Sequence, residues 1–237
     1  MHAKNRLFKT VAVVVFLFIS LPGISNAWHD ETHLAVAKAA GYHKWYNAAG
    51  PDIAKIKAGD KENRNHYSSN PPNSTVTPEM VLAQVNHYND PADENGHLYG
   101  AIVASLRDYR SAKATGKYGE YHMAYCAHYV GDLSMPLHNT LFDDFNRQHH
   151  SDMDGVVEDE VLSHLDRVKI YPIQIKSEDD LAKEIARIAN LSMKLGYQLE
   201  RENRMLTKEE AYVQLGHSAS LLKAILEYVK STVQSGG

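Results

Sequence analysis

The chain contains a single cysteine, Cys126, among 237 residues. One cysteine cannot close an intramolecular disulfide, and we expect this residue to lie in the core as a small apolar side chain. No convincing run of alternating polar and apolar residues is present, which argues against β-strands. Beyond the N-terminus, no apolar run approaches the roughly 20 residues of a transmembrane helix.

The first 27 residues have the features of a secretory signal peptide. Three basic residues precede an apolar run over residues 10–21, and Ser25 and Ala27 then provide the small side chains that a signal peptidase reads. An uncleaved membrane anchor is the alternative, but this run is shorter than the roughly 20 residues of a span. We therefore expect residues 1–27 to be removed and residues 28–237 to form a secreted or periplasmic domain.

Little positive charge remains once that segment is removed. The 25 Lys and Arg residues fall to 22, against 29 Asp and Glu, which gives a formal charge of −7. An acidic surface does not attract polyanions at long range, so the electrostatic footprint of most nucleic-acid binders is missing. A cationic metal cluster could still hold a single phosphate. Histidine is abundant, with 14 copies, which suits a metal-binding protein without establishing one.

The spacing of apolar residues is helical almost throughout and predicts one all-α domain, without internal repeats or a linker. We expect helices over residues 31–40, 78–88, 97–114, 118–131 and 150–168. Two C-terminal helices are expected to begin at the sequences Ser177-Glu178-Asp179-Asp180 and Thr207-Lys208-Glu209-Glu210, which resemble capping boxes. Residues 49–77, which are rich in Gly, Pro and Asn, are expected to form a long surface loop.

One stretch of the chain combines metal-ligating side chains at short spacing. His128 and Asp132 lie four residues apart on an expected helix and therefore project from the same face. Pro136 cannot continue that helix, so the chain bends and His138 can return towards the other two. Two imidazoles and a carboxylate that converge form a site for a borderline cation, zinc above all. The alternative is a buried, hydrogen-bonded polar cluster.

Further candidate ligands lie on either side of this motif. His150 and Asp154 repeat the four-residue spacing, with His149 as a competing histidine that has Met153 four residues on. Asp52 and His66 bracket a polar segment, and His33 lies on the first expected helix. The remaining histidines are expected to be packed or surface residues, namely His29, His43, His87, His97, His122, His164 and His217.

Trp28 becomes a candidate ligand through processing. Cleavage after Ala27 frees its α-amine, whose unperturbed pKa of about 7.7–8.0 lets zinc displace the proton at neutral pH. The amine and the carbonyl oxygen of Trp28 would then form a five-membered chelate ring with the metal.

Together these residues resemble the superfamily of prokaryotic zinc-dependent phospholipases C and fungal and plant single-strand nucleases. In that family the mature N-terminal Trp is a metal ligand, and a His-x-x-x-Asp-x-x-x-x-x-His motif ends in Pro-Leu-His, as residues 136–138 do here. The resemblance covers about residues 28–154 and implies an all-α fold that holds three zinc ions. It assigns Asp52, His66, His128 and Asp132 to one ion, His138, His150 and Asp154 to a second, and Trp28 and His33 to a third, with Asp132 bridging.

The resemblance also implies a chemistry. Zinc lowers the pKa of bound water to about 7, so a hydroxide bridging two ions would attack the phosphorus of a diester in line. The third ion would stabilise the leaving alkoxide. Asp52 stands where the family's proposed general base lies, in addition to its expected role as a ligand. No protein partner is implied, and we expect a monomer.

The chain combines sequence features of both branches of the family. The short interval between His138 and His150, the lack of disulfides, and Gly50-Pro51-Asp52 in place of Trp-Ala-Asp favour the phospholipases. The closeness of His33 to Trp28, and Asp154 where phospholipases tend to have Glu, are nuclease features. We expect a phospholipase C-like phosphodiesterase acting on phospholipids, with a single-strand nuclease or 3′-nucleotidase as the alternative. A non-catalytic exported zinc-binding protein is the second alternative.

Other charged residues bear on the substrate. Lys55, Lys57, Lys61 and Arg64 fall between two candidate ligands, and are either contacts for a phosphate or head group or solvated loop charges. Glu31 lies where choline-preferring members of the family use a glutamate. Ile53 replaces the aromatic residue that should accompany it, which argues against a choline preference.

Overall fold

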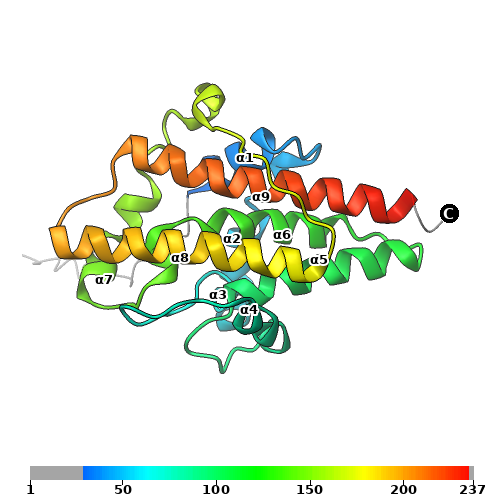
Figure 1. The fold of residues 1–237 in the computed structure, drawn as a ribbon, viewed down its shortest axis with the longest axis horizontal. Helices are drawn as coiled ribbons and strands as arrows, with labels where there is room; N and C mark the ends of the chain where they lie inside the picture. The colour runs from blue at the N-terminus through cyan, green and yellow to red at the C-terminus, as the bar shows by residue number, and fades with distance from the viewer. Residues whose placement is uncertain (1–28, 235–237) are drawn as a thin grey trace, which may run out of the picture.

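A computed structural model describes residues 29–234, which are all-helical and contain no strand (Figure 1). The α-helices are α1 (Asp30–Ala39), α2 (Gly50–Ala58), α3 (Asp60–Asn63), α4 (Pro78–Gln84), α5 (Leu98–Ala114), α6 (Glu120–Leu133), α7 (Asp144–Asp154), α8 (Glu178–Glu202) and α9 (Lys208–Gln234). The 3-10 helices are η1 (Trp45–Asn47), η2 (Val85–His87), η3 (Pro136–Asn139), η4 (Val161–Ser163) and η5 (Leu165–Arg167). The predicted all-α class is confirmed, while the predicted signal peptide lies outside the described residues. Within those residues, no helix combines the length and apolar character of a membrane span.

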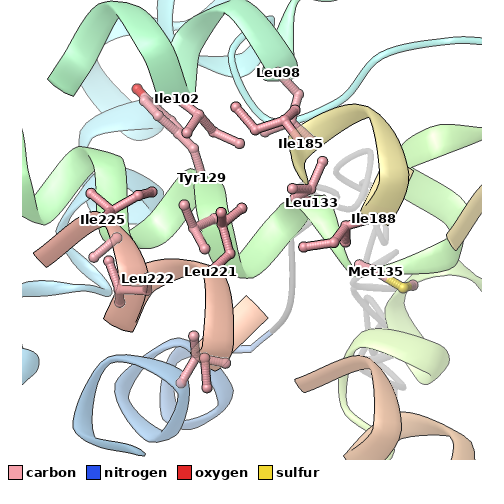
Figure 2. Packing of buried hydrophobic residues seen from close by; sticks show 14 of the residues in the cluster. Leu98, Ile102, Tyr129, Leu133, Met135, Ile185, Ile188, Leu221, Leu222 and Ile225 are labelled. Atoms are coloured by element: carbon pink, nitrogen blue, oxygen red, sulfur yellow. The ribbon is translucent and has the colours of Figure 1, made fainter. Parts of the chain in front are cut away.

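The core lies between the long helices. α5 packs against α6, and α8 and α9 run side by side in opposite directions across them (Figure 1). Figure 2 shows the meeting of these helices, where Ile102 of α5, Leu133 of α6, Ile185 of α8 and Leu222 of α9 are fully buried. Each such side chain stabilises the fold by about 1.5–3 kcal/mol. α6 is central to this packing, and its C-terminal part carries His128 and Asp132.

The two C-terminal helices begin where the sequence predicts. Ser177 Oγ accepts a hydrogen bond from the Asp180 N–H at 3.1 Å. At α9, Thr207 Oγ1 accepts from the Glu210 N–H at 3.2 Å while a Glu210 carboxylate oxygen accepts from the Thr207 N–H at 3.0 Å. Both arrangements satisfy backbone donors that a helix N-terminus leaves unpaired.

The expectation of a surface loop over residues 49–77 is wrong for its first half, which forms α2 and α3. Gly50 and Pro51 begin α2 rather than breaking it, because proline in the first turn loses no helical hydrogen bond. Gly59, with φ of +57°, then separates the two helices. This matters for the site, because Asp52 sits on a helix and not on a loop.

The expected helix over residues 150–168 is also wrong at both ends. α7 begins at Asp144, where the Asp143 carboxylate accepts a hydrogen bond from the Asn146 N–H at 2.9 Å. It ends at Asp154, directly before Gly155, and turns with η4 and η5 follow. The helical spacing of His150 and Asp154 survives this correction, since both residues lie within α7.

Cys126 is fully buried on α6, as expected of a core residue. Its Sγ lies 3.7 Å from the Ile102 carbonyl oxygen. Burial raises the pKa of its thiol to about 12, so the thiol stays protonated at neutral pH.

Candidate metal centre

Eight of the nine candidate ligands lie in the described residues, and the fold gathers them at one place. They come from α1 (His33), α2 (Asp52), the turn after α3 (His66), α6 (His128, Asp132), η3 (His138) and α7 (His150, Asp154). All are buried except Asp52, which is partly buried. The ninth candidate, Trp28, lies outside the described residues.

A first set of ligand atoms, here called the Asp52 group, consists of Asp52, His66, His128 and Asp132. His66 Nδ1 lies 3.8 Å from Asp52 Oδ1 and 3.0 Å from Asp132 Oδ2. His128 Nε2 lies 3.5 Å and 3.3 Å from the same two oxygens. One ligand atom from each of Asp52, His66 and His128 lies within 4.8 Å of the other two, a separation that a single ion can span.

A second set, the His138 group, consists of His138, His150 and Asp154. The two Nε2 atoms of the histidines lie 3.1 Å apart. Asp154 places Oδ2 3.3 Å from His150 Nε2 and Oδ1 4.0 Å from His138 Nε2. These three buried residues form another set of ligand atoms compatible with one metal ion.

Asp132 joins the separate parts of the centre. Its Oδ1 lies 3.4 Å from His33 Nε2 and 3.5 Å from His138 Nδ1. His33 stacks on His128, with ring centroids 3.6 Å apart. The third set, the His33 group, therefore consists of His33, His128 and Asp132. Asp132 faces all three sets.

The outward-facing nitrogens of four histidine rings each meet an acceptor. The pairs are His128 Nδ1 with Ala48 O at 2.7 Å, His138 Nδ1 with His66 O at 2.6 Å, His150 Nδ1 with Asn146 Oδ1 at 2.7 Å, and His66 Nε2 with Glu62 Oε1 at 3.2 Å. A carbonyl oxygen can only accept, so the ring nitrogen facing it must carry the proton. The Asn146 amide nitrogen donates to Leu137 O, which leaves its oxygen towards His150. In His138 and His150, whose pKa values are lowered by burial, the other nitrogen of the neutral ring then presents a lone pair to the centre.

This arrangement makes lone pairs face each other. The Nε2 atoms of His138 and His150 point towards each other at a distance of 3.1 Å. Two lone pairs at this distance repel unless a cation lies between them. Burial lowers the pKa of His138 to about 4 and that of His150 well below its ordinary value, so a proton does not fill this role in the His138 group at neutral pH. A metal ion fits there.

The carboxylates support the same conclusion. Neither oxygen of Asp154 accepts a hydrogen bond, and burial raises the pKa of this carboxyl well above its ordinary value. An ionised carboxylate without a partner is costly to bury, and a bound cation would remove that cost. Burial opposes ionisation of Asp132 too, but the neighbouring His128 and His138 outweigh it and hold the pKa of Asp132 well below its usual range. The Asp132 carboxyl is therefore ionised, which is the form that binds a cation.

A cavity of about 380 Å³ opens beside the ligands, a volume suited to a small molecule. His66, His138 and His150 form part of its wall. Lys55 and Arg64 also line it, whereas Lys57 and Lys61 are exposed elsewhere on α2 and α3. Of the four basic side chains between Asp52 and His66, two therefore line the cavity and two are exposed to solvent.

Lys55 is the most buried of these four basic residues. Its Nζ is 2.5 Å from Asp52 Oδ1, and the residue is 8% exposed. Burial opposes ionisation of Asp52, but His128 and Lys55 outweigh it and lower the pKa of the Asp52 carboxyl. Asp52 therefore stays ionised, which suits a ligand better than a general base that must take up a proton.

Comparisons with protein-family models, with curated proteins and with solved structures gave no match. The interpretation of the centre therefore rests on its own geometry and on the residues that the sequence singles out.

Several supporting residues were missed by sequence reasoning. Glu62 and Asn146 hold the outer nitrogens of His66 and His150, and Glu62 lies four residues before His66, the spacing used to find the other pairs. Glu158 accepts hydrogen bonds from Glu31 N, Thr32 N and Thr32 Oγ1 at 2.9, 3.2 and 3.0 Å. It thereby caps α1, whose own N-cap residue makes no side-chain bond.

The residues set aside by sequence reasoning stay outside the three groups. Within the described residues, no metal-compatible set includes His149 or any of the seven histidines expected to be packed or exposed. A second cavity of about 280 Å³, lined by Asp52 and Glu158 among others, borders the N-terminus of α1. Glu31 is exposed and lines neither cavity.

Proposed function

We propose that the chain is a zinc-dependent hydrolase of phosphate diesters that acts on phospholipid head groups in the manner of a phospholipase C. One observation carries this proposal: histidine lone pairs and buried carboxylates converge in three adjoining sets beside a cavity that also holds Lys55 and Arg64. Zinc ions held there would act as Lewis acids and lower the pKa of bound water. The expected number of three ions belongs to this proposal, with Trp28 completing the His33 group.

The chain's own residues have separate tasks in this proposal. Asp132 joins the Asp52 and His33 groups, because its two oxygens lie 3.0 Å from His66 Nδ1 and 3.4 Å from His33 Nε2. Lys55 and Arg64 attract the phosphate into the cavity and orient it. Leu137 and Phe142, on the same cavity wall, exclude water from part of the bound ester. Asp52 serves as a ligand that His128 and Lys55 hold in the ionised form.

A nuclease or nucleotidase acting on single-stranded nucleic acid is the second candidate. The observation that favours it is Phe142, which lines the cavity, is 53% exposed and lies with its ring centroid 6.3 Å from that of His150. An exposed aromatic ring beside a phosphate site provides a surface on which a base can stack. The same ring also suits the apolar part of a lipid, so the substrate must be decided by assay.

Metal analysis tests the premise common to both candidates. Protein purified after signal-peptide removal should contain at least two zinc ions per chain. Fewer than two would refute the catalytic proposal. Bound zinc without hydrolysis of any ester would favour a non-catalytic zinc-binding protein.

A parallel assay tests the substrate. Phosphatidylcholine, phosphatidylethanolamine and single-stranded DNA should be offered to the same zinc-loaded preparation, with a chelated sample as control. Release of phosphorylated head group supports the phospholipase proposal. Release of nucleotide or phosphate from DNA alone would replace it with the nuclease.

A further inference from the structure

Glu62 is a buried carboxylate that does not line the cavity and contacts a candidate ligand, His66. It is 4% exposed, and its Oε1 lies 3.2 Å from His66 Nε2. The Tyr129 hydroxyl donates a hydrogen bond of 2.7 Å to the same oxygen, and the Asn65 amide donates one of 3.3 Å to the other oxygen. Among the described residues, its one ion-pair partner is His66.

Glu62 differs from the acceptors behind the other rings. Those behind His128, His138 and His150 are neutral oxygens, two from backbone carbonyls and one from Asn146. The acceptor behind His66 is a carboxylate. A carboxylate that accepts the outer N–H of a histidine fixes the ring's tautomer and makes its inner nitrogen a stronger electron donor.

We propose that Glu62 is a positioning residue that orients His66. It thereby strengthens metal binding in the Asp52 group and leaves metal binding in the His138 group unaffected. The inference rests on the metal binding proposed above and on no particular substrate. With the proton held on Nε2 by Glu62, His66 Nδ1 presents its lone pair towards Asp52, His128 and Asp132. Loss of the carboxylate would let the ring rotate or change tautomer.

A hydrogen-bonded chain holds Glu62 in place from behind. Tyr129 is fully buried in the core (Figure 2), and its ring meets His66 edge-on with centroids 5.5 Å apart. The Asn65 oxygen faces His97 Nε2 at 2.8 Å, and His97 Nδ1 lies 3.2 Å from Asp93 Oδ2. Glu62 is thus supported by α6 and by the turn before α5, so it can hold His66 rigidly.

Glu62→Gln is the decisive variant. Glutamine keeps the shape and can still accept from His66, but it removes the charge and places an amide group near the Asn65 amide donor. Glu120→Gln is a matched control, since Glu120 is also a buried glutamate (8% exposed) but pairs with Lys44 and Lys113 away from the ligands. Tyr129→Phe removes one support of Glu62 while keeping the ring in the core.

The readout is metal affinity for each ion, measured by titrating the metal-free protein with zinc and, separately, with cobalt(II), whose visible absorption reports its ligands. In Glu62→Gln we expect one ion to bind about 10–100-fold more weakly, with an altered cobalt spectrum for that ion and unchanged binding in the His138 group. Tyr129→Phe should show a smaller loss at the same ion, and Glu120→Gln should show none.

Three outcomes would overturn the inference. Wild-type affinity and spectrum for every ion in Glu62→Gln would remove the positioning role. A loss shared equally by all ions, or matched by Glu120→Gln, would show general destabilisation instead. Wild-type protein that binds no metal would overturn the proposed function itself, and the inference with it, which distinguishes that failure from the first two.

Discussion

The Nε2 atoms of His138 and His150 lie 3.1 Å apart although each ring donates its Nδ1 proton elsewhere, to the His66 carbonyl and to Asn146. Neutral imidazoles do not adopt this arrangement without a reason, because their lone pairs repel. The fold therefore holds these two lone pairs in a repulsive arrangement, and a cation bound between them would remove the repulsion. This relationship leads to the first prediction.

Removing metal should destabilise the protein. An ion that binds the folded chain but not the unfolded chain raises the free energy of unfolding by about 2.7 kcal/mol when its free concentration is 100 times its Kd. For a domain of this size, that corresponds to a fall in Tm of about 5–10 °C per ion upon chelation. Thermal unfolding with EDTA, followed by zinc back-titration, measures the effect. An unchanged Tm after complete metal removal would contradict it.

Asp132→Asn should disrupt the centre most. The asparagine has the same shape but no charge, and its amide group would face ring nitrogens of the Asp52 and His33 groups. We expect zinc to be lost from those groups, while the His138 group, whose metal-compatible set does not include Asp132, keeps its ion. Hydrolytic activity should fall by more than the roughly 10–100-fold typical of outer-shell changes.

Zinc content per chain and the rate of ester hydrolysis measure the Asp132 effect. Asp108→Asn, at an exposed aspartate on α5, provides the control and should change neither quantity. Full zinc content in Asp132→Asn would show that the aspartate is not a ligand.

Lys55 and Lys57 offer a matched pair on α2. Lys55 lines the cavity and contacts Asp52, whereas Lys57 is exposed. Removal of a charge-assisted phosphate contact costs about 1.5–3 kcal/mol, so Lys55→Met should lower kcat/KM by about 10–100-fold. Lys57→Met should leave it unchanged. Equal kinetic effects of the two substitutions would show that the cavity is not where the phosphate binds.

Stability should depend on pH through Glu210 at the start of α9. Arg204 donates two hydrogen bonds of 2.8 Å to its carboxylate and, with the Thr207 backbone, lowers its pKa from 4.5 to about 2. Because the folded-state pKa lies below the unfolded value, the stabilisation is present above pH 4.5 and is lost as the pH falls towards 2.

The expected contribution of Glu210 is about 1 kcal/mol, the size of a helix cap, since the side chain is partly solvated. Glu210→Gln should therefore be less stable than wild type at pH 6 and approach it near pH 2, as measured by urea unfolding. Glu227→Gln, at an exposed position on the same helix, should follow the wild-type curve. A constant difference between Glu210→Gln and wild type at all pH values would contradict the assignment.

The sequence predicts those parts of the centre that have a fixed spacing. The pairs His128/Asp132 and His150/Asp154 need only a helix to bring them to one face, and both lie on helices. Convergence of these pairs with His33, Asp52 and His66 depended on family resemblance, because no local rule relates residues so far apart. Their roles as ligands remain predictions.

Other parts could not be predicted, for two different reasons. The carbonyls of Ala48 and His66 that orient His128 and His138 are backbone atoms, and no side-chain pattern reveals them. Glu62 could have been found from its spacing to His66, but reading residues 49–77 as a loop hid that signal. Pro51 misled that interpretation, because proline near a helix start is favourable and not disruptive.

The origin of the ligands in distant segments has a consequence for the order of events during folding. His66 meets Asp132 across 66 residues and His128 across 62. The Asp52 and His33 groups therefore cannot form until α6 packs against the N-terminal helices, whereas the ligands of the His138 group all come from residues 138–154. Contacts this far apart in sequence form slowly. Metal binding in the Asp52 and His33 groups should accordingly be a late step, and its rate should report completion of the tertiary fold.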